Sequence, residues 1–200
     1  MIDRERHPFH RHAEVELFLA RNASGRVVGR VAAARNKLHE ETHSEPVGFF
    51  GFFETERDPA IACALLDAAG AWLAARGLTT MRGPASFSLT EECGLLVDGF
   101  DTPPMVMMAH NPPWYADVLE AAGMRKTKDL LAYLRGVYPP QERLVAFERI
   151  ARERYDVTVR PFDKSKFGEE VERIRTLYNA AWEANWGFVP MTEAEFNHIA

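Results

Sequence analysis

VGFFGFF, at positions 47–53, is the stretch that decides the fold. Both of its alternating faces are apolar, which is typical of a central strand covered on each side. Gly51 in its middle would weaken a plain strand, and glycines at such positions recur at bulges and close backbone approaches. The stretch therefore predicts a buried strand with an irregularity at Gly51.

A hairpin is expected before this strand and a helix after it. Residues 14–20 and 26–32 have strand patterns and are separated by a glycine-containing turn. Asp58 is a favourable N-cap, Pro59 suits the first helical position, and Gly77 supplies a stop signal. Between them an apolar stripe recurs at three- and four-residue steps: Ile61, Leu65, Leu66, Ala69, Trp72 and Leu73.

Alternating strand and helix signals continue along the chain. We expect strands at 79–82, at 105–108 as a second buried strand with methionines as core filler, and at 128–134. A helix is expected from Asn111 to Ala122. This succession implies mixed α/β layers.

A boundary is expected at 136–140, where glycine and two prolines occur. Beyond it the patterns predict an amphipathic helix at 141–155, a short strand at 157–162, a long helix at 167–186 and a further helix capped by Thr192. We expect the parent polypeptide to continue past the last of these.

The composition is that of a globular protein. Of 200 residues, 46% are hydrophobic and 26% charged, and the formal net charge is −5, which argues against a nucleic-acid partner. An uncharged run of roughly 18 apolar residues is missing and the first residues are charged, so neither a membrane partner nor a secretory signal is expected. Two cysteines in unrelated contexts favour a cytoplasmic location.

Histidines occur in two groups. His39 and His43 form an H-E-x-x-H pattern, which on a buried helix could bind zinc with the intervening Glu activating water. We favour a solvated turn or strand end, because no apolar residue anchors the pentapeptide. His7, His10 and His12 fit no zinc spacing and are expected on a surface segment.

Two loops could carry chemistry. Glu92 belongs to an acidic pair that could supply a general base, and Cys93 would be a nucleophile if His110 lay close. The alternative is that these loop carboxylates are solvated or cap a helix. Asn111 begins a helix after an expected strand, where amides attract anions, or it is simply a cap.

Four short stretches carry a family resemblance: VGFFGFFE (47–54), ECGLLV (92–97), GFDTPP (99–104) and HNPP (110–113). They resemble a bacterial group of the GNAT superfamily of acyl-CoA-dependent N-acyltransferases, in which two GNAT-like halves lie in tandem. The resemblance covers 8–134, and 155–200 resembles the opening of a second half. It implies a mixed, mostly antiparallel sheet flanked by helices. The implied division is a degenerate GNAT-like half (1–138), a linker helix (139–155) and the start of a second half (156–200).

The resemblance implies acetyl-CoA as cofactor, its diphosphate held by a Q/R-x-x-G-x-G/A loop between the central strand and the next helix. Arg57 and Ala62 fit this pattern, but Ala60 replaces the first glycine, Asp58 adds a negative charge and Pro59 removes an amide donor. A like charge near a phosphate costs about 1–4 kcal/mol. A lost hydrogen bond to a charged group costs about 1.5–3 kcal/mol. We therefore expect a degenerate loop that does not bind acetyl-CoA measurably.

The resemblance also implies a tyrosine general acid four residues before the glycine that ends the later helix. That glycine would be Gly123, so the position is Leu119, and Tyr115 lies one turn earlier on the same face. The candidate catalytic residues are Glu92 and Tyr115, the candidate cofactor-binding residues are Arg57, Ala60, Ala62 and Asn111, and no metal ligand is expected.

The function implied is acetyl transfer from acetyl-CoA to a small-molecule or protein amine, with this half not catalytic by itself and packed on its own C-terminal GNAT half. One alternative is a non-catalytic scaffold or ligand-binding module. A more distant alternative is a zinc peptidase acting through His39 and His43.

Overall fold

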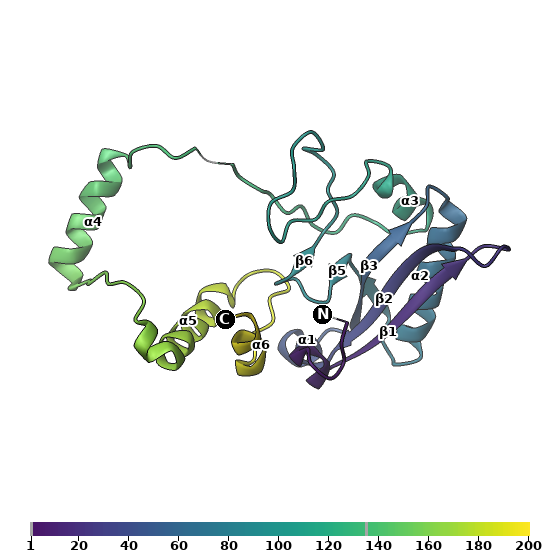
Figure 1. Ribbon diagram of the computed structural model, residues 1–200, viewed down its shortest axis with the longest axis horizontal. Helices are drawn as coiled ribbons and strands as arrows, with labels where there is room; N and C mark the ends of the chain where they lie inside the picture. The colour runs from purple at the N-terminus through teal and green to yellow at the C-terminus, as the bar shows by residue number, and fades with distance from the viewer. Residues whose placement is uncertain (1, 135) are drawn as a thin grey trace.

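The computed structural model describes residues 2–134 and 136–200 (Figure 1). Its elements, in chain order, are η1 (Pro8–Arg11), β1 (Ala13–Arg21), β2 (Val27–Asn36), α1 (Lys37–His43), β3 (Val47–Thr55), α2 (Pro59–Ala74), β4 (Thr80–Arg82), β5 (Ala85–Ser86), β6 (Glu92–Cys93), α3 (Tyr115–Ala121), α4 (Glu142–Tyr155), η2 (Lys164–Lys166), α5 (Phe167–Trp182) and α6 (Glu193–Ile199).

The fold is α/β, with a mostly antiparallel sheet flanked by helices, as predicted. The main sheet has the order β1-β2-β3-β4, and only the β3–β4 pair is parallel. A separate two-stranded sheet joins β5 to β6. The predicted hairpin corresponds to β1 and β2, and the predicted central strand to β3.

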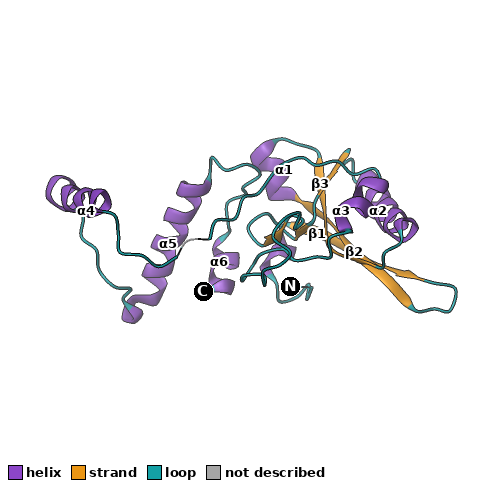
Figure 2. Ribbon diagram, turned by 90° about the horizontal axis from the view of Figure 1, so that it is seen from above, coloured by secondary structure: helices purple, strands orange, loops and turns teal. Residues whose placement is uncertain are grey.

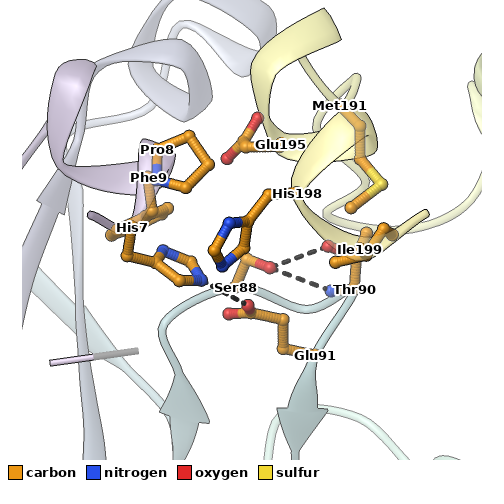
Figure 3. Close-up of a pocket in the computed structure, with 10 residues that line it drawn as sticks. All are labelled: His7, Pro8, Phe9, Ser88, Thr90, Glu91, Met191, Glu195, His198 and Ile199. Atoms are coloured by element: carbon orange, nitrogen blue, oxygen red, sulfur yellow. Dashed lines mark hydrogen bonds and ion pairs between the residues drawn. The ribbon is translucent and has the colours of Figure 1, made fainter. Parts of the chain in front are cut away.

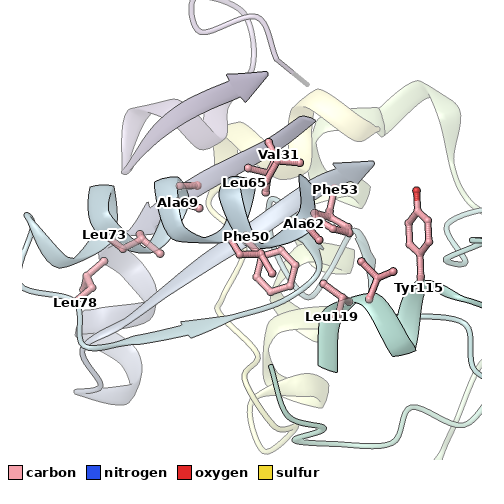
Figure 4. Packing of buried hydrophobic residues seen from close by; sticks show 13 residues of the cluster. Val31, Phe50, Phe53, Ala62, Leu65, Ala69, Leu73, Leu78, Tyr115 and Leu119 are labelled. Carbon is pink, nitrogen blue, oxygen red and sulfur yellow. The ribbon is translucent and has the colours of Figure 1, made fainter. Parts of the chain in front are cut away.

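Strand β3 is covered on both faces, which confirms the prediction from its apolar alternation. On one face Phe50 and Phe53 belong to a core formed with α2 and α3 (Figure 4). On the other face Val47 and Phe49 pack with Phe9 of η1 and with residues of β5 and its following loop. Figure 2 shows α2 and α3 together on one side of the sheet.

Helix α2 forms where its signals predict. The Asp58 side chain accepts a hydrogen bond from the Ala60 amide at 2.9 Å, and Pro59 is the first helical residue. The helix ends before Gly77, whose φ of +79° is readily adopted by glycine. Its buried residues are Ala62, Leu65, Leu66, Ala69 and Leu73.

Three predicted strands are wrong. Residues 105–108 form no strand, and their side chains are 41–92% exposed, so the methionines are not core filler. Prolines flank this run on both sides, and a four-residue apolar run does not by pattern alone distinguish a strand from a loop. Residues 128–134 and 157–162 also lie outside any strand of the structure.

Two predictions for the histidine segments are also wrong. The H-E-x-x-H pentapeptide is not a solvated turn, because it lies in α1, whose N-cap Asn36 accepts hydrogen bonds from the amides of Leu38 and His39. The N-terminal histidines are not on a loose surface segment, because η1 is anchored by Phe9, which is 2% exposed.

The last part of the chain returns to the first part. His12 lies 2.8 Å from Glu195, His43 Nε2 donates to the carbonyl oxygen of Phe188 at 2.8 Å, and the Arg82 guanidinium lies over the Trp186 ring. Helices α5 and α6 confirm the two predicted C-terminal helices, and Thr192 forms the predicted cap with a reciprocal bond to Glu195. Among the described residues, the structure contains no helix of the length and apolarity needed to span a bilayer.

Candidate functional site

A bulge in β3 shapes the candidate site. Ala32 pairs with Gly51, but Arg30 pairs with Glu54, so two residues of β3 lie opposite one residue of β2. The first of these, Phe52, has a φ of +47°, a strained value for a residue with a side chain. Its amide turns away from β2 and donates to the Ser86 hydroxyl at 3.2 Å.

Gly51 is required at the bulge because another backbone approaches it closely. A Cβ at this position would lie 1.9 Å from the carbonyl oxygen of Ala85 in β5. The prediction that Gly51 marks both a bulge and a close approach is therefore confirmed.

Tyr115 lies against the end of β3, beyond the bulge. Its hydroxyl donates to Glu54 Oε2 at 2.6 Å and accepts a hydrogen bond from the Thr55 amide at 3.3 Å. Burial, and then the hydrogen bond to Glu54, raise the pKa of Tyr115 to about 12. The Tyr115 ring belongs to the core, and its hydroxyl points away from the cluster (Figure 4).

Glu54 is the partner that the sequence did not single out. Its side chain is 58% exposed, and Arg30 lies 4.0 Å from its other carboxylate oxygen. A protonated phenol, a carboxylate and a guanidinium therefore meet at the end of β3. This arrangement can hold a proton on Tyr115 and accept one on Glu54.

The predicted diphosphate loop does lie at the junction of β3 and α2, but four of its amides already have partners. The Asp58 amide donates to the Glu56 carbonyl oxygen, and the Ala60 amide to the Asp58 side chain. The amides of Ile61 and Ala62 both donate to the Asp58 carbonyl oxygen. The residues present do not fit a diphosphate, because binding would require these bonds to break and would bring a phosphate beside the Asp58 carboxylate.

Not all four candidate cofactor-binding residues belong to that loop surface. Arg57 and Ala60 are exposed there, but Ala62 is fully buried in the core beneath α2. Asn111 neither caps a helix nor lies free to bind a cofactor. Its side chain accepts a hydrogen bond from the Leu96 amide at 2.8 Å and donates one to the Leu96 carbonyl oxygen at 3.2 Å. Asn111 therefore ties two loops together, and α3 begins only at Tyr115.

The two candidate catalytic residues lie on different elements with different surroundings. Glu92 is exposed on β6, where it pairs with Ser86, whereas Tyr115 is buried against β3. The Cys93 thiol contacts the Leu89 carbonyl oxygen at 3.5 Å, and burial raises its pKa, which disfavours a thiolate nucleophile. His110, its expected partner, is exposed.

The H-E-x-x-H helix brings its histidines together without the rest of a zinc site. The His39 and His43 rings lie 4.5 Å apart, but Glu40, next to His39, is held by Arg35 at 2.7 Å. His39 is 1% exposed, burial lowers its pKa to about 4, and neither ring nitrogen has a hydrogen-bond partner. Within 2–134 and 136–200, no group of three His, Cys, Asp or Glu side chains is arranged to hold a metal ion.

A second constellation lines a small pocket between η1, the β5–β6 connection and α6 (Figure 3). His7 Nε2 lies 3.7 Å from Glu91, and the His198 ring stands edge-on to the His7 ring at 5.0 Å. Burial lowers the pKa of His7 and raises that of Glu91. These groups come from segments nearly 200 residues apart, so only the return of α6 to η1 could have revealed them.

Comparisons with known proteins give relatives but no structural template. No protein-family model matches the chain, and no solved structure is significantly similar to it. The chain is 43% identical over 198 residues to the bacterial ceramide synthase of Caulobacter vibrioides, which is 96% of this chain and 50% of that protein. It is 38% identical over 190 residues to protein YghO of Escherichia coli, which is 92% of this chain and 47% of that protein. The chain thus spans about half the length of the curated relatives it matches.

Proposed function

We propose that this chain forms one half of an N-acyltransferase of the GNAT type, which transfers an acyl group from acyl-CoA to a primary amine. The relative named bacterial ceramide synthase supports this proposal. A ceramide is a fatty acid joined by an amide bond to a long-chain amino alcohol, so its synthesis is an N-acylation. The donor we propose is accordingly acyl-CoA in general, of which acetyl-CoA, expected from the sequence, is the shortest common case.

The observation that carries the proposal is the arrangement at the end of β3. The bulge, the Tyr115 hydroxyl and Glu54 lie where the chain passes from the central strand toward the helix α2. In an acyl transfer the amine nitrogen attacks the thioester carbonyl, the C–N bond forms and the C–S bond breaks. The amine loses a proton and the thiolate gains one. Tyr115 holds a proton for such a step and Glu54 can accept one.

The amides at the β3–α2 junction limit what this half does. Because four of them are bonded to Asp58 and Glu56, we propose that this half does not hold the coenzyme diphosphate. We propose that the other half of the parent protein binds it and that the two halves pack together. The same observation favours the second candidate, a non-catalytic half that supports its sister.

A chimera tests the function. This chain would replace the matched stretch of the Caulobacter relative, and thiol release from an acyl-CoA would be followed in the presence of a long-chain amino alcohol. We expect transfer by the chimera and neither transfer nor micromolar acyl-CoA binding by the 200-residue chain. A folded chimera without transfer contradicts the function, and micromolar binding by the chain contradicts the account of its loop.

The Tyr115→Phe substitution in the chimera separates the two candidates. If Tyr115 moves a proton, the rate falls by roughly 10²–10⁴-fold while binding of the acyl-CoA changes little. If this half is only a support, the rate stays within a few fold of that of the unsubstituted chimera. Asp117→Asn is the matched control, because Asp117 lies exposed on the same helix, α3.

A further inference from the structure

The segment that leads from α3 to α5 is unusual in its exposure. We call residues 125–162 the arm. Among its described residues none is buried, and all are exposed except Ala151, which is half-buried. In two perpendicular views its helix α4 stands apart from the rest of the chain (Figures 1 and 2). The arm therefore fully buries none of its described apolar side chains; Leu130 near Gly94 and Phe162 against Phe167 are only partly covered.

The composition of the arm is not that of a solvated linker. Linkers that remain in water are rich in polar residues, glycine and proline and poor in large apolar ones. The arm instead exposes a long series of large apolar side chains: Leu130, Leu131, Tyr133, Leu134, Val137, Tyr138, Leu144, Val145, Phe147, Ile150, Tyr155, Val157, Val159 and Phe162. Exposed apolar surface on this scale marks an interaction site.

Helix α4 shows which side faces the partner. Leu144, Phe147 and Ala151 recur at helical spacing and form an apolar stripe, and the first two are 44% and 65% exposed. Arg149 lies on the opposite side of the helix, where charged residues dominate. An isolated helix of this length is only marginally stable in water. Most of the stability of α4 must therefore come from a partner that covers its apolar side.

The two ends of the arm behave in the same way. Residues 157–162 are rich in strand-forming residues, and 128–134 expose three leucines and Tyr133, yet neither segment belongs to a strand of the structure. Extended segments without a neighbouring strand leave backbone amide and carbonyl groups that a partner strand can bind. Strands from outside this chain could therefore pair with these segments.

We propose that the arm is the docking surface for the second half of the parent protein, which covers the apolar side of α4 and pairs with 128–134 and 157–162. The occupant is a domain equivalent to the unmatched half of the curated relatives. Those relatives match this chain over 92–96% of its length, a range that includes most or all of the arm, and each has about as many residues again. The inference rests on the proposed function only in assigning a second half to the parent protein.

Amide hydrogen exchange tests the docking surface. Exchange at 128–134 and 157–162 would be compared between this chain alone and the chimera with the unmatched part of the Caulobacter relative. We expect exchange in the chimera to be at least about tenfold slower at both segments, with the β1–β2 amides unchanged as a check of folding. Equal exchange in a folded chimera overturns the proposal. So does protection that appears in the chain alone and rises with its concentration, because the occupant would then be a second copy.

Two further measurements keep the test decisive. In the natural Caulobacter protein the aligned segments should be protected, and rapid exchange there also overturns the proposal. In the chimera, Phe147→Asp should restore fast exchange at both segments, whereas the matched Arg149→Asp on the opposite side of α4 should not. Acyl transfer is read separately: protected segments without transfer refute the proposed function alone, and transfer with unprotected segments refutes the docking surface alone.

Discussion

Replacing Tyr115 by phenylalanine should lower the free energy of unfolding measurably, even in the isolated chain. The substitution removes a donor to Glu54 at 2.6 Å and an acceptor for the Thr55 amide at 3.3 Å, while the ring remains in the core. Glu54 is 58% exposed, so water replaces most of its lost bond, but Thr55 is only 9% exposed and its amide would be left without a partner.

The magnitude follows from that difference in exposure. A buried amide without a hydrogen-bond partner costs about 1–3 kcal/mol, and the solvated carboxylate adds little. We therefore expect Tyr115→Phe to lower the free energy of unfolding by about 1–3 kcal/mol in urea titrations near neutral pH. Tyr133→Phe is the control: Tyr133 is 86% exposed, and its substitution should change stability by less than about 0.5 kcal/mol. A Tyr115→Phe variant indistinguishable from this control would refute the hydrogen-bond geometry.

The pH dependence gives a second reading of the same pair. The pKa of Tyr115 is raised by burial to about 12 in the folded state from its ordinary value of 10.0, so the folded state holds the proton more tightly. The resulting stabilisation is fully present below pH 10 and is lost as the pH rises from 10 toward 12. Stability of the natural chain should therefore fall more steeply over that range than stability of Tyr115→Phe, and parallel curves would contradict the assignment.

Three other substitutions follow from the packing. Gly51→Ala should destabilise the chain strongly, because its Cβ would meet the Ala85 carbonyl oxygen at 1.9 Å. Gly70→Ala in α2 meets nothing within 4 Å and should raise the free energy of unfolding by about 0.5–1 kcal/mol. Urea midpoints of the two variants that shift in the same direction would be inconsistent with this packing. Burial lowers the pKa of His39 from 6.5 to about 4, so the fold loses stability as the pH falls from 6.5 toward 4. The melting temperature of His39→Leu should therefore depend less on pH over that range than that of the natural chain. An equally steep loss of stability in the variant would show that another group is responsible. Leu73→Ala should lower the free energy of unfolding by about 2–5 kcal/mol, since Leu73 lies on the buried side of α2 and is 1% exposed. A loss below about 1 kcal/mol by calorimetry would contradict a closely packed core there.

The parts of the fold that sequence predicts well depend on local signals. The N-cap at Asp58, the proline at the first helical position and the stop at Gly77 act within one turn of the backbone they govern, and α2 begins and ends within three residues of them. Strand β3 was predictable because both of its faces are apolar, a pattern typical of a central strand that is covered on each side. Gly51 also indicated the irregularity in this strand, because a glycine inside a strand is typical of a bulge or of a close approach by another backbone.

The candidate site was only half predictable, because its contacts join distant residues. Tyr115 was found through the family resemblance, one turn before the position that the resemblance implies, but Glu54 is its partner only because α3 packs beside the end of β3. The pocket formed by His7 and His198 depends on the return of α6 to η1 across the whole chain. Asn111 illustrates the opposite error: it stands where a cap is expected, yet its side chain binds the backbone of Leu96.

The wrongly predicted strands at 128–134 and 157–162 carry information of their own. A helix satisfies its backbone groups from within, so α2, α4 and α5 form wherever their local signals are adequate. A strand needs a neighbour, and β3 has two, β2 and β4, supplied by the same chain. Segments that were predicted as strands but lie exposed in the structure are therefore the places where this chain lacks a neighbour. Both segments flank α4, and the apolar side of α4 is uncovered as well. The missing contacts therefore lie on one continuous stretch of 38 residues, 125–162, rather than over the whole surface.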